Sequence, residues 1–234
     1  MADRQLYLIT GPTSGMPLDH AVDAALSGGV QWVQLRAKTL PARRQLALAS
    51  ALGRLCRTHG AVFLINDRVD VAIAAGSHGV HLGEQGLPPA VARRLLPPGA
   101  LVGVSVHSVE AARAAAAAGA DYLMFGNVYP TASHPGKPGA GVDALAQVVA
   151  AVDRPVLAVG GITPANVLDV LATGCAGVAV ISAILQAPDP ARAAAAFRER
   201  MAACPDPPLH AMPQIGTHDA AEEVYHDPHQ LERH

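Results

Sequence analysis

The chain has 234 residues, of which 50% are hydrophobic and 3% aromatic, and its formal net charge is −2. A near-neutral chain with no basic stripe has no general attraction for nucleic acid or anionic membranes, and no apolar segment approaches the roughly 18 residues of a membrane span. Three distant cysteines (Cys56, Cys175 and Cys204) argue against a disulfide framework or a metal-ligand spacing, and the polar residues 1–5 carry no signal region, so we expect a reducing, cytoplasmic location.

Eight short apolar runs alternate with eight stretches of helical character along the chain. Strands are predicted at residues 6–10, 30–35, 62–65, 79–82, 101–105, 122–125, 156–159 and 178–181. Helices are predicted near residues 17–27, 41–58, 68–75, 88–96, 108–118, 142–152, 164–173 and 189–202, with Ser108 and Asp189 as N-caps. Such alternation indicates a parallel sheet, and eight units favour its closure into a single (β/α)8 TIM barrel. An open doubly wound sheet is the alternative, weakened because no GxGxxG motif follows the first strand.

The composition changes at Cys204, where the apolar periodicity stops. The remaining segment, residues 204–234, holds five prolines, five of the eleven histidines and six acidic residues. We therefore predict a barrel domain over residues 1–203 and a disordered tail over residues 204–234.

The loops after the last two predicted strands have the character of a phosphate site. Gly160 and Gly161 follow the seventh strand, and Ile181 and Ser182 follow the eighth. Barrels of this class commonly bind phosphate in these two loops, through free backbone N–H groups that glycine leaves accessible. We predict phosphate binding by these four residues.

Polar side chains also follow the second and third predicted strands. Gln34, Arg36 and Lys38 supply an amide and two cations that suit a phosphate or diphosphate. Asn66 and Asp67 suit a hydroxyl, an amine or Mg²⁺, although they could equally cap the next helix.

The fourth to sixth predicted strands end in groups that could handle protons or bind substrate. His81 could face the barrel interior, as a core residue or as a site residue, whereas Ser105 and His107 end the fifth strand. An imidazole is an acid or base near neutral pH. The long loop over residues 126–141 is of the kind that covers substrate. Its candidate substrate-binding and catalytic residues are Asn127, Thr131, Ser133 and His134.

These motifs occur in an order that resembles the superfamily of thiamine-phosphate synthase and thiazole tautomerase. The matching segments are LYLIT, VQLRAK, INDRVD, GVHLGE, GVSVHS, ADYLMFGNVYPT, PVLAVGGIT and GVAVISAIL, within residues 6–200. The resemblance implies a (β/α)8 barrel that acts on a small-molecule thiazole phosphate in thiamine biosynthesis.

The resemblance implies two different activities with different requirements. A synthase joins hydroxymethylpyrimidine diphosphate to thiazole phosphate with Mg²⁺, and Asp67 would be a metal ligand, but Gly86 stands where the family has a second carboxylate. Glu84 is the nearest substitute, out of register. A tautomerase needs a phosphate site and a proton carrier without metal, but Asn127 stands where that family often has its histidine, and asparagine cannot act as a base.

We expect a thiazole tautomerase-like isomerase that uses no cofactor, with His107 as the first candidate proton carrier and His134 as the second. The alternatives are the Mg²⁺-dependent synthase and a non-catalytic protein that binds thiazole phosphate. Neither nucleic acid nor membrane is an expected partner, and a homo-oligomer is compatible with the sequence.

Overall fold

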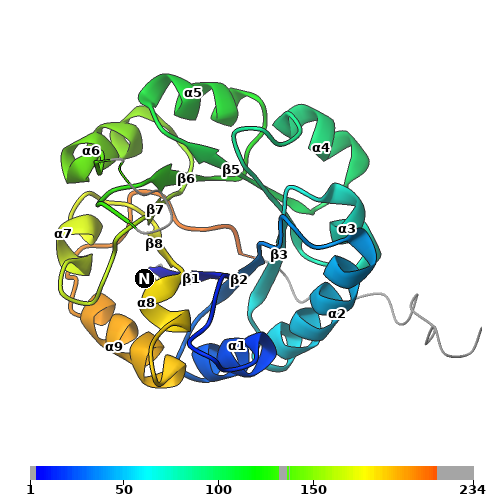
Figure 1. Ribbon diagram of the computed structural model, residues 1–234. Helices are drawn as coiled ribbons and strands as arrows, with labels where there is room; N and C mark the ends of the chain where they lie inside the picture. The colour runs from blue at the N-terminus through cyan, green and yellow to red at the C-terminus, as the bar shows by residue number, and fades with distance from the viewer. Residues whose placement is uncertain (1–3, 132–135, 137, 215–234) are drawn as a thin grey trace, which may run out of the picture.

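The computed structural model describes residues 4–131, 136 and 138–214, and it is a closed barrel of eight parallel strands surrounded by helices (Figure 1). The strands pair in sequence order, and β1 closes the barrel against β8. Their bounds are β1 Gln5–Ile9, β2 Trp32–Leu35, β3 Val62–Asn66, β4 Gly79–Leu82, β5 Leu101–Val106, β6 Tyr122–Gly126, β7 Val156–Val159 and β8 Gly177–Val180. The predicted (β/α)8 barrel is confirmed.

The helices form the outer ring of the barrel (Figure 1). Their bounds are α1 Leu18–Ser27, α2 Ala42–Thr58, α3 Val69–Ala74, α4 Pro89–Leu95, α5 Val109–Ala117, α6 Gly141–Ala151, α7 Val167–Leu171, α8 Ser182–Leu185 and α9 Pro190–Ala202. The one-turn helix α8 was not expected, because four residues are too few for a helical period to show in a sequence. The side chains of Ser108 and Asp189 cap α5 and α9, as predicted, by accepting from backbone N–H groups three residues later.

The strands alternate their side chains between the interior of the barrel and the helices around it. On β1, for instance, Leu6 and Leu8 pack outward in the large core cluster, whereas Tyr7 and Ile9 point inward. The interior cluster is a separate, largely apolar plug. It consists of Tyr7, Ile9, Trp32, Leu64, Leu101, Tyr122, Met124, Leu157, Ala176, Ala179 and Met212. Polar side chains that point inward are therefore surrounded by a barrel interior filled with packed side chains.

The beginning of the expected tail packs against the barrel instead of leaving it. Residues 205–214 cross the end of the barrel where the strands begin, and Met212 is buried in the interior cluster (Figure 1). The buried Arg4 guanidinium donates to the carbonyl oxygens of Cys175 and Asp206, at 2.5 and 2.9 Å. This packing left no sign in the sequence, because the proline-rich segment packs as irregular backbone and shows no periodic spacing of apolar residues. The rest of the expected tail, residues 215–234, lies outside the described residues.

Two sequence expectations concern the chain as a whole. The cysteines are free thiols: Cys56 and Cys175 are buried and Cys204 is partly exposed. Within the described part of the chain, no helix combines the length and the apolar character needed to cross a bilayer.

Candidate active site

A cavity of about 840 Å³ opens at the end of the barrel where the strands finish. It gathers most of the residues that the sequence singled out for binding or catalysis. Those lining it are Gln34, Arg36, Lys38, Asn66, Ser105, His107, Asn127, Thr131, Gly160, Gly161, Ile181 and Ser182. Two predicted residues, Ser133 and His134, lie outside the described residues.

The end of β2 brings two cations to one side of the cavity. Gln34 is buried, whereas Arg36 and Lys38 extend into solvent at the rim. The buried Thr10, just after β1, fixes the backbone here: its Oγ1 accepts from Arg36 N at 2.8 Å. The two cations therefore sit on a strand end that is held from the neighbouring strand.

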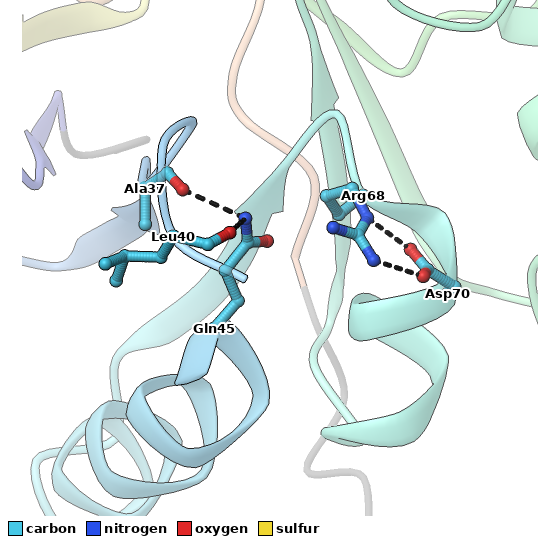
Figure 2. Close-up of polar contacts among 5 residues, drawn as sticks. All are labelled: Ala37, Leu40, Gln45, Arg68 and Asp70. Carbon is cyan, nitrogen blue, oxygen red and sulfur yellow. Dashed lines mark hydrogen bonds and ion pairs between the residues drawn. The ribbon is translucent and has the colours of Figure 1, made fainter. Parts of the chain in front are cut away.

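The loop that carries Lys38 is also tied to the helix that follows it. Gln45, in the first turn of α2, is buried and its Nε2 donates to the carbonyl oxygens of Ala37 and Leu40, at 2.9 and 2.7 Å (Figure 2). These two bonds bracket Lys38 and restrict the backbone on both sides of it. A polar residue near the start of an amphipathic helix gave no signal of this role in the sequence.

Asp67 occupies a strained turn directly after β3. Its φ is +60°, a left-handed conformation that Asp tolerates better than most residues, and Arg68 N donates to Asn66 O across it at 2.7 Å. The turn directs the carboxylate across to the loop after β4, where Asp67 Oδ1 accepts from Gly83 N at 2.7 Å. Asp67 Oδ2 lies 3.4 Å from Lys38 Nζ.

The alternative role of Asp67 as a helix cap is wrong. The cap position of α3 is Arg68, without a side-chain cap, and Arg68 pairs instead with Asp70 on the helix, at 2.8 Å from Nε to Oδ1 (Figure 2). Asp67 thus does not cap the helix. It does not line the cavity itself, but it contacts two residues that do, Lys38 and Gly83, and its charge balances that of Lys38.

The structure explains the departure at Gly86 in geometric terms. A Cβ placed on Gly86 would lie 2.8 Å from Asp67 Oδ1, so a side chain at this position would meet the carboxylate directly. Glu84 does not take that place: its Oε1 lies 3.9 Å from His107 Nε2. Across the described residues, no three His, Cys, Asp or Glu side chains converge as a metal cage.

His107 lies at the rim, half-exposed, at the end of β5. Its Nδ1 contacts the carbonyl oxygen of Gly126, and a carbonyl can only accept, so Nδ1 carries the proton. In the neutral ring the lone pair is then on Nε2, on the side of Glu84.

The loop after β6 closes one wall of the cavity. The amide of Asn127 donates from Nδ2 to Tyr129 O at 3.1 Å, so part of its hydrogen-bonding capacity is used within its own loop. Burial raises the pKa of the Tyr129 phenol, and the negative charge of Asp169 raises it further. Thr131, the last described residue before the gap in this loop, lines the cavity.

The loops after β7 and β8 form a second polar region of the cavity. Gly160 and Gly161 both have positive φ, +101° and +65°, and the Gly161 turn is fixed by Asn166 Nδ2, which donates to Gly161 O at 3.1 Å. Ser182 begins the one-turn helix α8, in which the N–H groups of Ile184 and Leu185 donate to Ile181 O, so the N–H groups of Ser182 and Ala183 lie at the open start of the turn. Backbone N–H groups at such a turn and helix start suit an anion.

Beneath the cavity, polar side chains cross the otherwise apolar interior. His81 is buried, and its Nε2 lies 2.9 Å from Ser105 Oγ while its Nδ1 lies 3.0 Å from Tyr122 Oη. Burial lowers the pKa of His81 to about 4, although the charge of Asp67 acts in the opposite direction. The sequence left His81 open between core and site, and the structure places it at the cavity floor, touching both.

The chain is similar to proteins of one family over most of its length. The family model described as thiamine monophosphate synthase matches residues 6–184. A Geobacter sulfurreducens protein named "Putative thiamine-phosphate synthase" is 54% identical over 199 residues, 83% of this chain and 93% of the relative. A thiamine-phosphate synthase of Methanoculleus marisnigri is 49% identical over 201 residues, 85% of this chain and 95% of the relative. The solved structure of thiamine phosphate pyrophosphorylase from Pyrococcus furiosus matches with a TM-score of 0.79 at 38% identity, covering 85% of this chain and 95% of that one.

Proposed function

This chain belongs to the thiamine monophosphate synthase family, and from that premise we propose that it is a thiamine-phosphate synthase. The family makes it an enzyme of thiamine biosynthesis that acts on small molecules. The proposed reaction couples hydroxymethylpyrimidine diphosphate to thiazole phosphate and releases diphosphate. This was the alternative in the sequence analysis, and the names of the relatives favour it over the tautomerase.

The observation that carries the proposal is that one cavity has two regions suited to anions. Arg36 and Lys38 stand at the end of β2, while the turn at Gly161 and the start of α8 at Ser182 stand at the ends of β7 and β8. Coupling needs both regions, because each of its two substrates carries phosphate. A tautomerase with a single phosphorylated substrate needs only one of them.

The chemistry assigns a different task to each region. The bond between the pyrimidine methylene carbon and the diphosphate oxygen breaks, and its electron pair leaves with the diphosphate. The lone pair of the thiazole nitrogen then forms the new carbon–nitrogen bond. Arg36 and Lys38 stabilise the charge that develops on the leaving diphosphate, and the β7 and β8 loops hold the thiazole phosphate.

The donor set at Asp67 fits a Mg²⁺ that enters with the diphosphate. Mg²⁺ commonly binds through one or two carboxylates together with substrate phosphates and water, and Asp67 supplies one carboxylate on the side of Lys38. When bound, the ion would neutralise charge on the leaving group. The expectation of no cofactor belonged to the tautomerase, and in its place we propose Mg²⁺ held by Asp67 and the diphosphate.

The proposed reaction gives His107 no proton to carry. The attacking thiazole nitrogen has no hydrogen, so coupling requires no general base, in contrast to tautomerisation. We therefore assign His107 and Asn127 to the cavity wall, where they bind rather than transfer protons. His134, the second candidate proton carrier, lies outside the described residues. The compartment and the oligomeric state of the enzyme stay predictions.

The decisive assay supplies both substrates to the purified protein, with Mg²⁺ and with a chelator. We expect thiamine phosphate and diphosphate in equal amounts, with a strong dependence on Mg²⁺. The thiazole tautomer is supplied alone in a parallel reaction. Aromatisation of the tautomer without coupling would support the tautomerase instead. Saturable binding of thiazole phosphate with neither reaction would support the non-catalytic alternative.

The loop anchor at Gln45 gives a prediction for diphosphate binding. Replacing Gln45→Met removes both donors to Ala37 and Leu40 at nearly constant side-chain volume, and frees the backbone around Lys38. We expect the KM for the pyrimidine diphosphate to rise by about threefold to tenfold, the scale of one or two lost hydrogen bonds. Steady-state kinetics with each substrate varied in turn measures this, and the KM for thiazole phosphate should stay constant. Equal rises in both constants would mean a general loss of structure.

The crowding at Gly86 gives a prediction for the metal. A Cβ at this position would lie 2.8 Å from Asp67 Oδ1, so Gly86→Asp would make the Asp67 side chain shift and would place a second carboxylate next to it. We expect the Mg²⁺ concentration for half-maximal activity to fall by about threefold to tenfold, since carboxylate count tunes affinity for divalent cations. Gly86→Asn is the matched control, with the same shape and no charge. A shift of the same size in both variants would contradict a role of the carboxylate.

A further inference from the structure

One line of hydrogen bonds crosses the barrel under the cavity and joins two of its lining residues. It begins at Gln34 on β2, passes through Tyr7, Tyr122 and His81, and ends at Ser105 on β5. Tyr7 Oη donates to Gln34 Oε1 at 3.1 Å and lies 3.1 Å from Tyr122 Oη. Tyr122 Oη lies 3.0 Å from His81 Nδ1, and His81 Nε2 lies 2.9 Å from Ser105 Oγ.

The three middle members are sealed from solvent. Tyr7 and Tyr122 are fully buried, and His81 is 2% exposed. Gly103 leaves the space that the Tyr122 ring occupies, since a Cβ there would lie 2.1 Å from the ring. The Tyr7 ring is held in turn by stacking on Trp32, with ring centroids 6.0 Å apart. A broken link in this line would leave a buried polar group unsatisfied, which is costly.

The number of protons sets the direction of every bond in the line. Tyr7 has one proton, which it gives to Gln34, so it must accept from Tyr122. Tyr122 has then used its own proton and must accept from His81 Nδ1. A neutral imidazole with its proton on Nδ1 has its lone pair on Nε2, which accepts from the Ser105 hydroxyl.

The two ends of the line consequently face the cavity with opposite character. The Gln34 Nε2 points away from Tyr7 and offers N–H donors to the cavity. The Ser105 hydroxyl donates its proton to His81 Nε2, so it offers only a lone pair to the cavity. Rotating the Gln34 amide would reverse every bond, so that Gln34 accepts and Ser105 donates. In either direction the floor offers one donor and one acceptor, never two of a kind.

We propose that this line couples the hydrogen-bonding character of Gln34 and Ser105, and that Tyr7, Tyr122 and His81 are positioning residues for a ligand edge carrying one donor beside one acceptor. The inference rests on the proposed function for the identity of that edge. An aminopyrimidine presents such an edge, with an amine that donates and a ring nitrogen that accepts. The coupling would select this ring from inside the barrel, through His81 on the cavity floor and two tyrosines that do not line the cavity.

The direction of the line can be measured without turnover, by nitrogen NMR of the His81 imidazole. We expect one fixed tautomer in the wild-type protein, with the proton on Nδ1, and His81→Gln identifies the signals. Tyr122→Phe keeps the ring and removes the acceptor of that proton, so the proton should move toward Nε2, where it can be donated to Ser105. Unchanged His81 signals in Tyr122→Phe would overturn the proposal, because the imidazole would then not respond to the loss of its partner in the line.

The coupling itself is tested by a double-mutant cycle on the KM for the pyrimidine diphosphate. Tyr7→Phe and Ser105→Ala alter the line at positions separated by Tyr122 and His81, and the hydrogen bonds that join the two positions run through these two residues. We expect each single variant to raise this KM by about fivefold. The rise in the double variant should be less than about half of the product of the two single rises, because the two residues share one network. A rise in KM equal to the product of the two single rises would contradict the coupling.

Two further readouts separate the possible failures. Leu157→Ala perturbs the same interior cluster without removing a hydrogen bond of the line, so it should lower Tm and leave the KM for the pyrimidine diphosphate constant. A wild-type protein that makes no thiamine phosphate would end the proposed function, whereas the NMR result would still decide whether the line is ordered.

Discussion

Asp67→Asn should lower kcat for thiamine phosphate formation by about 10²-fold to 10³-fold, the scale seen when one preorganised electrostatic group is removed from an active site. The change removes a charge and almost nothing else. Asparagine also tolerates a φ of +60°, and its Oδ1 can still accept from Gly83 N, as the carboxylate does at 2.7 Å. What is lost is the anion beside Lys38 and the carboxylate that fits Mg²⁺.

The matched control for this variant is Asp70→Asn, three residues further along the chain. Asp70 is exposed and pairs with Arg68 at the start of α3 (Figure 2), and neither residue lines the cavity. Its loss should leave kcat unchanged, because an exposed ion pair contributes little to stability. Titration of activity with Mg²⁺ in both variants is the measurement. Asp67→Asn with full activity and an unchanged Mg²⁺ dependence would remove Asp67 from the site.

The fold was predictable because each strand carries its own signal. Short β-branched runs, such as residues 156–159 and 178–181, alternate with helices whose starts are marked by residues such as Ser108. Chemistry in a barrel of this class gathers where strands end, so positions such as Arg36 and Gly161 followed from the strand assignment alone.

The parts of the site that escaped prediction depend on contacts between distant segments. Tyr7 and Tyr122 are 115 residues apart, and only barrel closure and strand register bring their hydroxyl groups to 3.1 Å. Gln45 similarly acts on a loop through side-chain geometry that no period reveals. The irregular segment around Met212 packs on the barrel for reasons of shape rather than pattern.

The names of the relatives favour the synthase over the tautomerase, which the sequence alone had placed first. The missing carboxylate at Gly86 was one of the features that weighed against the synthase. In the structure Asp67 keeps a defined place without that partner, held by Gly83 N and balanced by Lys38. A single substituted position in a motif is therefore weak evidence against an activity when the rest of the cavity carries groups suited to both substrates.

The second anion region gives the other large effect: Gly161→Val should raise the KM for thiazole phosphate by about 10-fold to 100-fold, the scale of one or two lost charge-assisted hydrogen bonds. Valine is rarely found at a φ of +65°, so the turn itself would have to change. Its Cβ would also lie 2.6 Å from Pro130 O and 2.7 Å from Tyr129 Cβ. Both effects displace the backbone N–H groups that face the phosphate.

Gly119→Val separates the loss of the site from backbone strain as such. Gly119 has a comparable φ of +91°, with nothing within 4 Å of a Cβ, and it follows α5 outside the cavity lining. It should lower Tm without changing either KM. Calorimetric titration with thiazole phosphate measures the binding directly in both variants. Since we propose that the pyrimidine diphosphate binds at the ends of β2 and β3, its affinity should survive in Gly161→Val. Loss of both ligands together would mean that the cavity has collapsed, and unchanged affinity for thiazole phosphate in a folded variant would remove Gly161 from the phosphate site.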